Sequence, residues 1–155
     1  MIRAVILWVH VLCGVVWVGA CAVFILAAAA SAGDPNESLA FAARAVPPIN
    51  RLCLVLAIAI PLTGIGNLFF VARARGSALP AEFLGILAAK ISLLVVMGVG
   101  LWGAWRAAAI LQGASANPGA ESRYEVSLHR IMASYGLIVA AGVGALGLGL
   151  WLSGT

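Results

Sequence analysis

The sequence predicts an all-α fold: an integral membrane antiparallel four-helix bundle with a short interfacial helix between the first and second spans. Composition is the first reason, because 64% of the 155 residues are hydrophobic and 9% are charged, whereas soluble domains carry roughly 25% charge. The mean hydropathy is +1.12. The second reason is that the apolar residues form four runs of about 20 residues or more, the length that crosses roughly 30 Å of hydrocarbon. We expect one transmembrane domain over 1–155.

The first predicted span covers about residues 4–31 and contains no charge up to residue 30. Its Ala-rich end offers small-residue sites of the kind at which signal peptides are cleaved. The apolar run is nevertheless far longer than the roughly 7–15 residues of a signal-peptide core. We therefore expect a true first membrane helix.

A short amphipathic helix is predicted over about 35–45, between the first two spans. Asp34 suits its N-cap, Pro35 its first turn, and Glu37 the third position, where a carboxylate meets free backbone N–H groups. Pro47-Pro48 then predicts the end of this helix, because proline lacks the N–H that a helix interior needs. We expect the segment to lie at the membrane interface.

The other three spans are predicted at about 49–72, 82–111 and 129–153. Short connections join them, the last through a turn at Asn117-Pro118-Gly119, so consecutive spans run in opposite directions. Small residues predict close helix packing, with a ladder at Gly136, Ala140 and Gly144. In the second span, Pro61 is followed by Gly64 and Gly66, which predicts a kink or a widened cavity.

The net charge of +4 comes from nine basic residues, eight of which flank the apolar runs. This pattern indicates anchoring at the membrane interface and does not indicate nucleic-acid binding. The side of the N-terminus carries Arg3, Arg73 and Arg75, and the other side carries Arg44, Arg51, Arg106, Arg123 and Arg130. The positive-inside rule then predicts an N-terminus outside the cell.

His10 is the most informative residue, because a polar, metal-binding side chain inside a membrane helix is costly and usually functional. At 100° per residue, Cys13, Trp17 and Cys21 lie on the same helical face within about 80° of arc. The three cysteines all lie in apolar runs, which does not predict a disulfide framework. Small packing residues are the ordinary interpretation of such cysteines.

A polar pocket is predicted around His10. Lys90 is the one charged residue well inside a span, and it lies at a depth similar to that of His10. Thr63, Asn67 and Ser92 reach the same leaflet if the spans alternate in direction. The alternative is that Lys90 extends its ammonium group to the interface and that His10 satisfies a backbone carbonyl.

His129 opens the fourth span on the opposite side of the membrane. In an antiparallel bundle it cannot join His10 as the second axial ligand of one haem, so a simple bis-histidine cytochrome is excluded. A haem on the His10 side would need Met97, Lys90, an open position or His10 of a second subunit. The ordinary interpretation of His129 is an interfacial cap or a lipid-headgroup contact.

Copper is the other candidate ligand of His10. Cu(I) prefers sulfur ligands and also accepts imidazole. Cys13 follows His10 by three residues on one helical face, and Met97 lies two turns beyond Lys90 on the third span. The predicted copper ligands are therefore His10, Cys13 and Met97, although the Lys90 ammonium would repel a cation.

The sequence resembles the bacterial copper-resistance D (CopD-like) membrane domain over roughly residues 5–110. The resemblance lies in His10 before Trp17-Val-Gly19, in Thr63-Gly64 of the second span, and in Gly85 followed by Lys90 in the third. It implies a copper-handling protein of the bacterial cytoplasmic membrane.

The related HemJ-type protoporphyrinogen oxidases, which are b-type haem proteins, share the first-span His, the Arg51-Leu52 opening and the third-span Lys. This chain departs from their pattern at Ala88, where those oxidases have a His, and it lacks an Asn-Glu-x-Pro start to the fourth span. Small four-helix relatives of both families share the His10 to Gly19 pattern.

Three functions follow as hypotheses. The first is copper binding or transfer across the membrane at His10. The second is a haem-b redox protein in which His10 is the axial ligand, Lys90 pairs with a propionate, and Thr63 and Asn67 line the pocket. The third is a structural subunit of a larger membrane complex. Asp and Glu lie only outside the apolar spans, so hydrolase chemistry is not predicted. The expected partners are the lipid bilayer and either a second copy or a larger complex.

Overall fold

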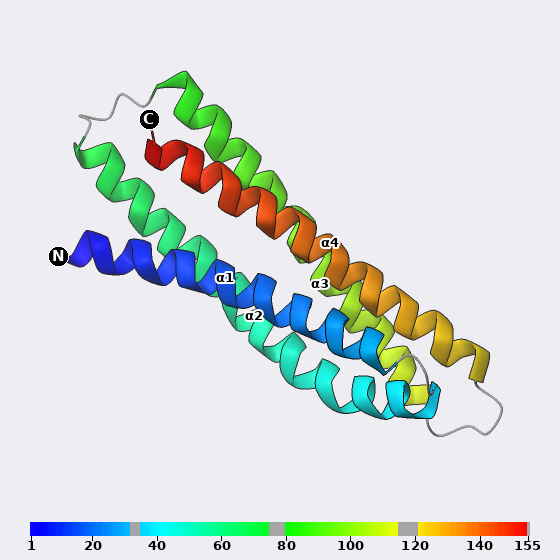
Figure 1. Ribbon diagram of the computed structural model, residues 1–155. Helices are drawn as coiled ribbons and strands as arrows, with labels where there is room; N and C mark the ends of the chain where they lie inside the picture. Colours follow the sequence, from blue (N-terminus) through cyan, green and yellow to red (C-terminus); the bar gives the residue numbers. More distant parts are fainter. Residues whose placement is uncertain (32–34, 75–79, 115–120, 155) are drawn as a thin grey trace.

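The computed structural model describes residues 1–31, 35–74, 80–114 and 121–154. The described residues form four long helices: α1 (Ile2–Ala30), α2 (Pro35–Ala74), α3 (Ala81–Ala114) and α4 (Glu121–Gly154) (Figure 1). Each contains a segment that is long and apolar enough to cross a membrane. The predicted all-helical fold with four apolar helices is confirmed.

The contacts between helices fix their register. A methyl group at Gly14 would lie 3.7 Å from Leu146, and one at Gly142 would meet Val18, so numbers rise along α1 as they fall along α4. Figure 1 shows both termini at the same end of the molecule. Helix α3 packs most extensively on α4, and α1 on α2.

The core occupies the half of the molecule that lies away from the termini. Among the described residues, the first buried positions are Trp17 on α1 and Met97 on α3. The last buried positions are Leu56 on α2 and Gly142 on α4. The largest fully buried side chains are Trp17, Tyr135, Phe24, Ile131, Ile138 and Val46. Phe24 packs edge-on to Tyr135 and stacks on Phe41.

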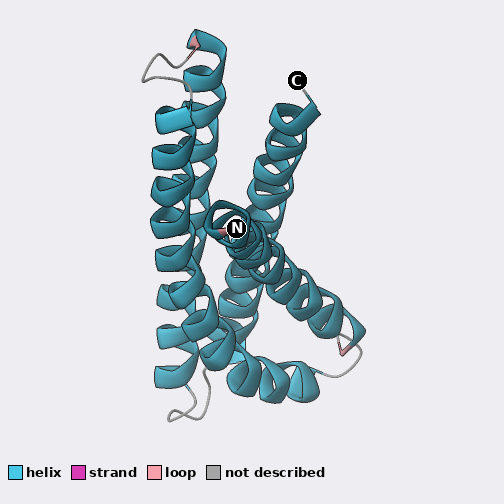
Figure 2. Ribbon diagram, turned by 90° about the vertical axis from the view of Figure 1, so that its left-hand side faces the viewer, coloured by secondary structure: helices cyan, strands magenta, loops and turns pink. Residues whose placement is uncertain are grey.

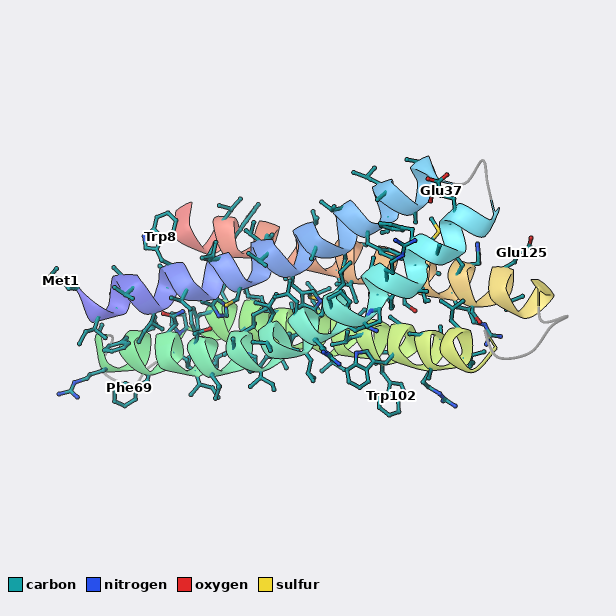
Figure 3. The ribbon with its side chains drawn as sticks, turned by 90° about the horizontal axis from the view of Figure 1, so that it is seen from below. Met1, Trp8, Glu37, Phe69, Trp102 and Glu125 are labelled. Atoms are coloured by element: carbon teal, nitrogen blue, oxygen red, sulfur yellow. The ribbon has the colours of Figure 1, made fainter. Side chains whose placement is uncertain are left out.

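Towards the termini, the helices diverge. Figure 2 shows the C-terminal part of α4 leaning away from the pair of helices on the left of that view. Large apolar side chains are exposed on all four helices, and Trp8, Phe69 and Trp102 project outward (Figure 3). The half near the termini contains the first 16 residues of the chain and the parts of α2, α3 and α4 beside them, and it is loosely packed. We call it the open half.

The prediction of a separate interfacial helix over 35–45 is wrong. Helix α2 continues through Pro47 and Pro48 to Ala74, and it bends between its cyan part near Glu37 and its green part (Figure 3). The reason is packing: Ala42 and Val46 are buried in the core, which offsets the hydrogen bonds that the prolines remove. Asp34, the expected N-cap, lies outside the described residues.

The predicted small-residue ladder on α4 is also wrong in part. A methyl at Gly136 would meet nothing within 4 Å, whereas one at Gly144 would lie 3.6 Å from Leu93; Ala140 is exposed. Close approach occurs instead at Gly100, where a methyl would lie 3.0 Å from the Ser134 carbonyl oxygen. The face of α4 that meets its neighbours is therefore rotated from the predicted one.

Candidate functional site

His10 lies in the open half, where α1 meets α2. Its Nδ1 is 2.9 Å from the Thr63 hydroxyl oxygen and 3.1 Å from the backbone carbonyl oxygen of Ile60. Ile60 immediately precedes Pro61, one of the three prolines within α2. Two contacts to one ring nitrogen fix the position of the imidazole against the second helix.

These contacts also fix the tautomer. A carbonyl oxygen accepts hydrogen bonds and cannot donate one, so the hydrogen bond to the Ile60 carbonyl requires the tautomer with its hydrogen on Nδ1. The Thr63 hydroxyl has its own acceptor, since it donates to the Ala59 carbonyl at 2.7 Å or to the Ile60 carbonyl at 3.1 Å. In the Nδ1–H tautomer, Nε2 of His10 carries a lone pair. A metal-binding histidine is held in the same way, with its other ring N–H on a carbonyl.

Gly64 makes room for the ring. A methyl group at this position would lie 3.3 Å from Cε1 of His10 and 3.8 Å from Nδ1. Any side chain here would displace the imidazole by a few tenths of an ångström. The Thr63-Gly64 pair thus supplies both the acceptor for His10 and the space in which the ring lies.

Lys90 lies at the same level on α3. Its ammonium nitrogen would be 3.2 Å from a methyl at Gly149 on α4. Gly149 lies three residues beyond Leu146, which faces Gly14 on α1, so the ammonium group lies near the level of His10. The half-buried side chain therefore packs along α4. The contacts put His10, Thr63 and Lys90 at a similar depth, and His10 contacts Thr63. The contact of His10 with the Ile60 carbonyl is the one that the alternative interpretation expects.

The other predicted pocket residues lie in different positions. Asn67 follows Thr63 by one turn on the same face of α2, next to Gly66, which lies against Ile6. Ser92 is exposed and donates its hydroxyl hydrogen to the Ala88 carbonyl at 3.0 Å, so it takes no part in the pocket. Cys13 is half-buried and packs against the edge of the core.

Met97 is not beside His10. A methyl at Gly142 would lie 3.4 Å from the Met97 terminal methyl and would also meet Val18, so the thioether shares the level of Val18. Val18 is two turns beyond His10 on α1, about 12 Å along the helix axis at 1.5 Å per residue. The predicted set of His10, Cys13 and Met97 is therefore not gathered at one point.

His129 lies on α4 at the far end of the molecule and is exposed. Because Gly142 faces Val18, the rise per residue puts His129 roughly 30 Å from His10 along the bundle. The two histidines of one chain cannot bind the same iron or copper ion. Among the described residues, no group of three or more His, Cys, Asp or Glu side chains is close enough to hold one ion.

The half of the molecule that contains the core, which we call the packed half, has polar contacts that the sequence did not predict. The Cys21 and Cys53 sulfurs face each other at 3.9 Å, and the Tyr135 hydroxyl donates to Oδ1 of Asn50 at 2.9 Å. Both pairs depend on how α1, α2 and α4 are rotated about their axes. The apolar periodicity of such uniformly hydrophobic helices carries little information on rotation.

No protein-family model, curated protein or solved structure matches this chain. The candidate site is therefore argued from its own geometry.

Proposed function

We propose that the protein is a multi-pass membrane protein that binds haem b, that Nε2 of His10 would hold the iron, and that the protein acts in electron transfer. The observation that carries the proposal is the Nδ1–H of His10 held by the Ile60 carbonyl. This hydrogen bond leaves a lone pair on Nε2 and orients the ring. Axial histidines of haem proteins need both properties.

The distribution of charge supports a position across the membrane. At one end of the bundle lie Arg3, Arg73 and Glu82. Arg51 lies two residues before Cys53 on α2, and Cys53 faces Cys21 on α1. Measured along α1, the level of Arg51 is therefore about 20 residues beyond that of Arg3. This separation is roughly 30 Å, the thickness of the hydrocarbon layer. Lys90 is the exception among the described charged residues within this band.

The open half supports haem over a single metal ion. No described side chain at the level of His10 is buried, and the helices diverge there (Figure 2). A flat, apolar group would cover side chains that are left exposed there, and the Lys90 ammonium near the level of His10 suits a propionate. When bound, haem supplies one-electron redox chemistry. His10 would hold the iron, and Thr63 would keep the imidazole in position.

Copper is the second candidate for His10. It is favoured by Cys13, which lies one turn from His10 on α1 and is half-buried. It is disfavoured by Lys90, a positive charge near the level of His10, and by the position of Met97 in another layer. The resemblance of the sequence to CopD-like and HemJ-type proteins supports either metal at His10, and with it the bacterial cytoplasmic membrane.

An absorption spectrum of the purified protein tests the proposal. The protein, expressed in a haem-replete host and purified in detergent, should show a Soret band. His10→Ala should lose the band, and His129→Ala, at the other end of the bundle, should keep it. If the protein shows no Soret band but binds Cu(I), and this binding depends on His10, then copper and not haem is the ligand of the site. If neither binds, both proposals fail, and a structural subunit of a larger complex becomes the better hypothesis.

A further inference from the structure

Two cysteines face each other in the packed half. Cys21 of α1 and Cys53 of α2 are both fully buried, at 0% exposure, and their sulfur atoms are 3.9 Å apart. One thiol donates a hydrogen bond to the other. Cys21 is eleven residues beyond His10, about 16 Å along the helix, so this pair is separate from the candidate haem site.

The neighbourhood of the thiol pair contains an unsatisfied donor. Trp17 lies one turn before Cys21 on the same face of α1, and its indole N–H is buried without a hydrogen-bond partner among the described residues. An unpaired buried donor costs about 1–3 kcal/mol. This N–H makes no hydrogen bond to either sulfur, so it does not occupy the lone pairs of the thiol pair.

The separation of the sulfurs fits one bridging ion. Two metal–sulfur bonds of roughly 2.3 Å span at most about 4.6 Å, and 3.9 Å lies within this limit. Zinc would need four ligands, and no third His, Cys, Asp or Glu joins the pair among the described residues. Thiolate ligands select soft ions such as Cu(I). A disulfide would instead require the sulfurs to approach to about 2.05 Å.

We propose that Cys21 and Cys53 form a binding site for one soft monovalent cation of the Cu(I) class. The ion replaces the proton shared by the two sulfurs: Cys21–SH and Cys53–SH with Cu⁺ give one thiolate–Cu–thiol unit and one released H⁺. No electron is transferred. The site keeps zero net charge, which matters because an unpaired charge is expensive in an apolar core.

Cu(I) titration of the full chain in detergent tests this site. With excess ascorbate and a colorimetric cuprous chelator as competitor, the protein should bind one Cu(I), and the affinity should fall at least 100-fold in Cys21→Ser and in Cys53→Ser. His10→Ala and Cys13→Ser should keep that ion. Unchanged affinity in the first two variants, or loss only in the last two, overturns the proposal.

A measurement on the unmodified protein guards against variants that fail to fold. Bound Cu(I) should protect Cys21 and Cys53 from alkylation in mild denaturant, as mapped by mass spectrometry, while Cys13 reacts. X-ray absorption should show sulfur neighbours of copper and no nitrogen neighbour. Equal alkylation of all three cysteines, or nitrogen ligation, refutes the site. A missing Soret band would not affect these results, so failure of the haem proposal is distinguishable.

Discussion

Nδ1 of His10 lies 3.1 Å from the carbonyl oxygen of Ile60, the residue before Pro61 in α2. This hydrogen bond joins α1 to α2 in the half of the molecule where no described side chain is buried. It fixes one rotation of α1 about its axis and one ring orientation of His10. The arrangement of the candidate site therefore depends on the backbone of α2 as well as on side chains.

The Thr63 hydroxyl tests the importance of ring orientation. Thr63→Val keeps the shape of the side chain but removes the oxygen 2.9 Å from Nδ1. The Ile60 carbonyl still holds the hydrogen, so we expect a loss of haem affinity of about tenfold, the lower end of the effect of residues that orient metal ligands. Haem transfer to apomyoglobin measures it. Thr63→Ser retains the oxygen and should behave like the wild type; equal losses in both variants would contradict this account.

Gly100 tests the packing of α3 on α4. In Gly100→Ala the new methyl would lie 2.8 Å from the Ile138 side chain and 3.0 Å from the Ser134 carbonyl oxygen. Because backbone cannot rotate away, the helices must separate, and we expect a loss of about 1–3 kcal/mol in stability. Unfolding by SDS in mixed micelles measures it. At Gly98 a methyl meets nothing within 4 Å, so Gly98→Ala should be neutral or stabilising. If Gly98→Ala destabilised the protein more than Gly100→Ala, the helices would pack by another face.

The buried pair of Tyr135 and Asn50 tests polar contacts in the core. Tyr135→Phe removes the donor to Oδ1 of Asn50 and leaves a buried acceptor unpaired. We expect a loss of about 1 kcal/mol, since hydrogen bonds between membrane helices are of this size. Asn50→Leu should restore part of the stability in the Tyr135→Phe background, because both polar groups are then absent. Additive losses in the double variant would mean that the two residues do not interact.

Depth along the membrane could be predicted from the sequence, because the rise per residue of a helix is fixed. Counting from the ends of the spans puts His10, Thr63 and Lys90 at one level, and the contacts of His10 with Thr63 and of Lys90 with α4 agree with it. Rotation about the helix axis could not be predicted. The helices are apolar on all sides, so no polar face indicates which side of α1 meets α2, and the Cys21–Cys53 pair was missed.

Proline rules were misleading for α2 for a related reason. Pro47 and Pro48 predict a helix end by local geometry, but Ala42 and Val46 on the preceding turn are fully or almost fully buried. Tertiary packing of that turn outweighs the local cost. The sequence shows the prolines directly, whereas the burial of their neighbours depends on partners far along the chain.

Lys90 distinguishes the two metals proposed for His10. Lys90→Met keeps a long side chain and removes the positive charge near the level of His10. If a propionate pairs with Lys90, haem should dissociate about fivefold faster, which corresponds to roughly 1 kcal/mol. If the His10 site holds Cu(I), the same change should tighten binding, because a repulsive charge is lost. Lys90→Arg preserves the charge and should leave haem retention near the wild-type value. Faster haem loss in Lys90→Arg than in Lys90→Met would show that the shape of this side chain, and not its charge, controls the site.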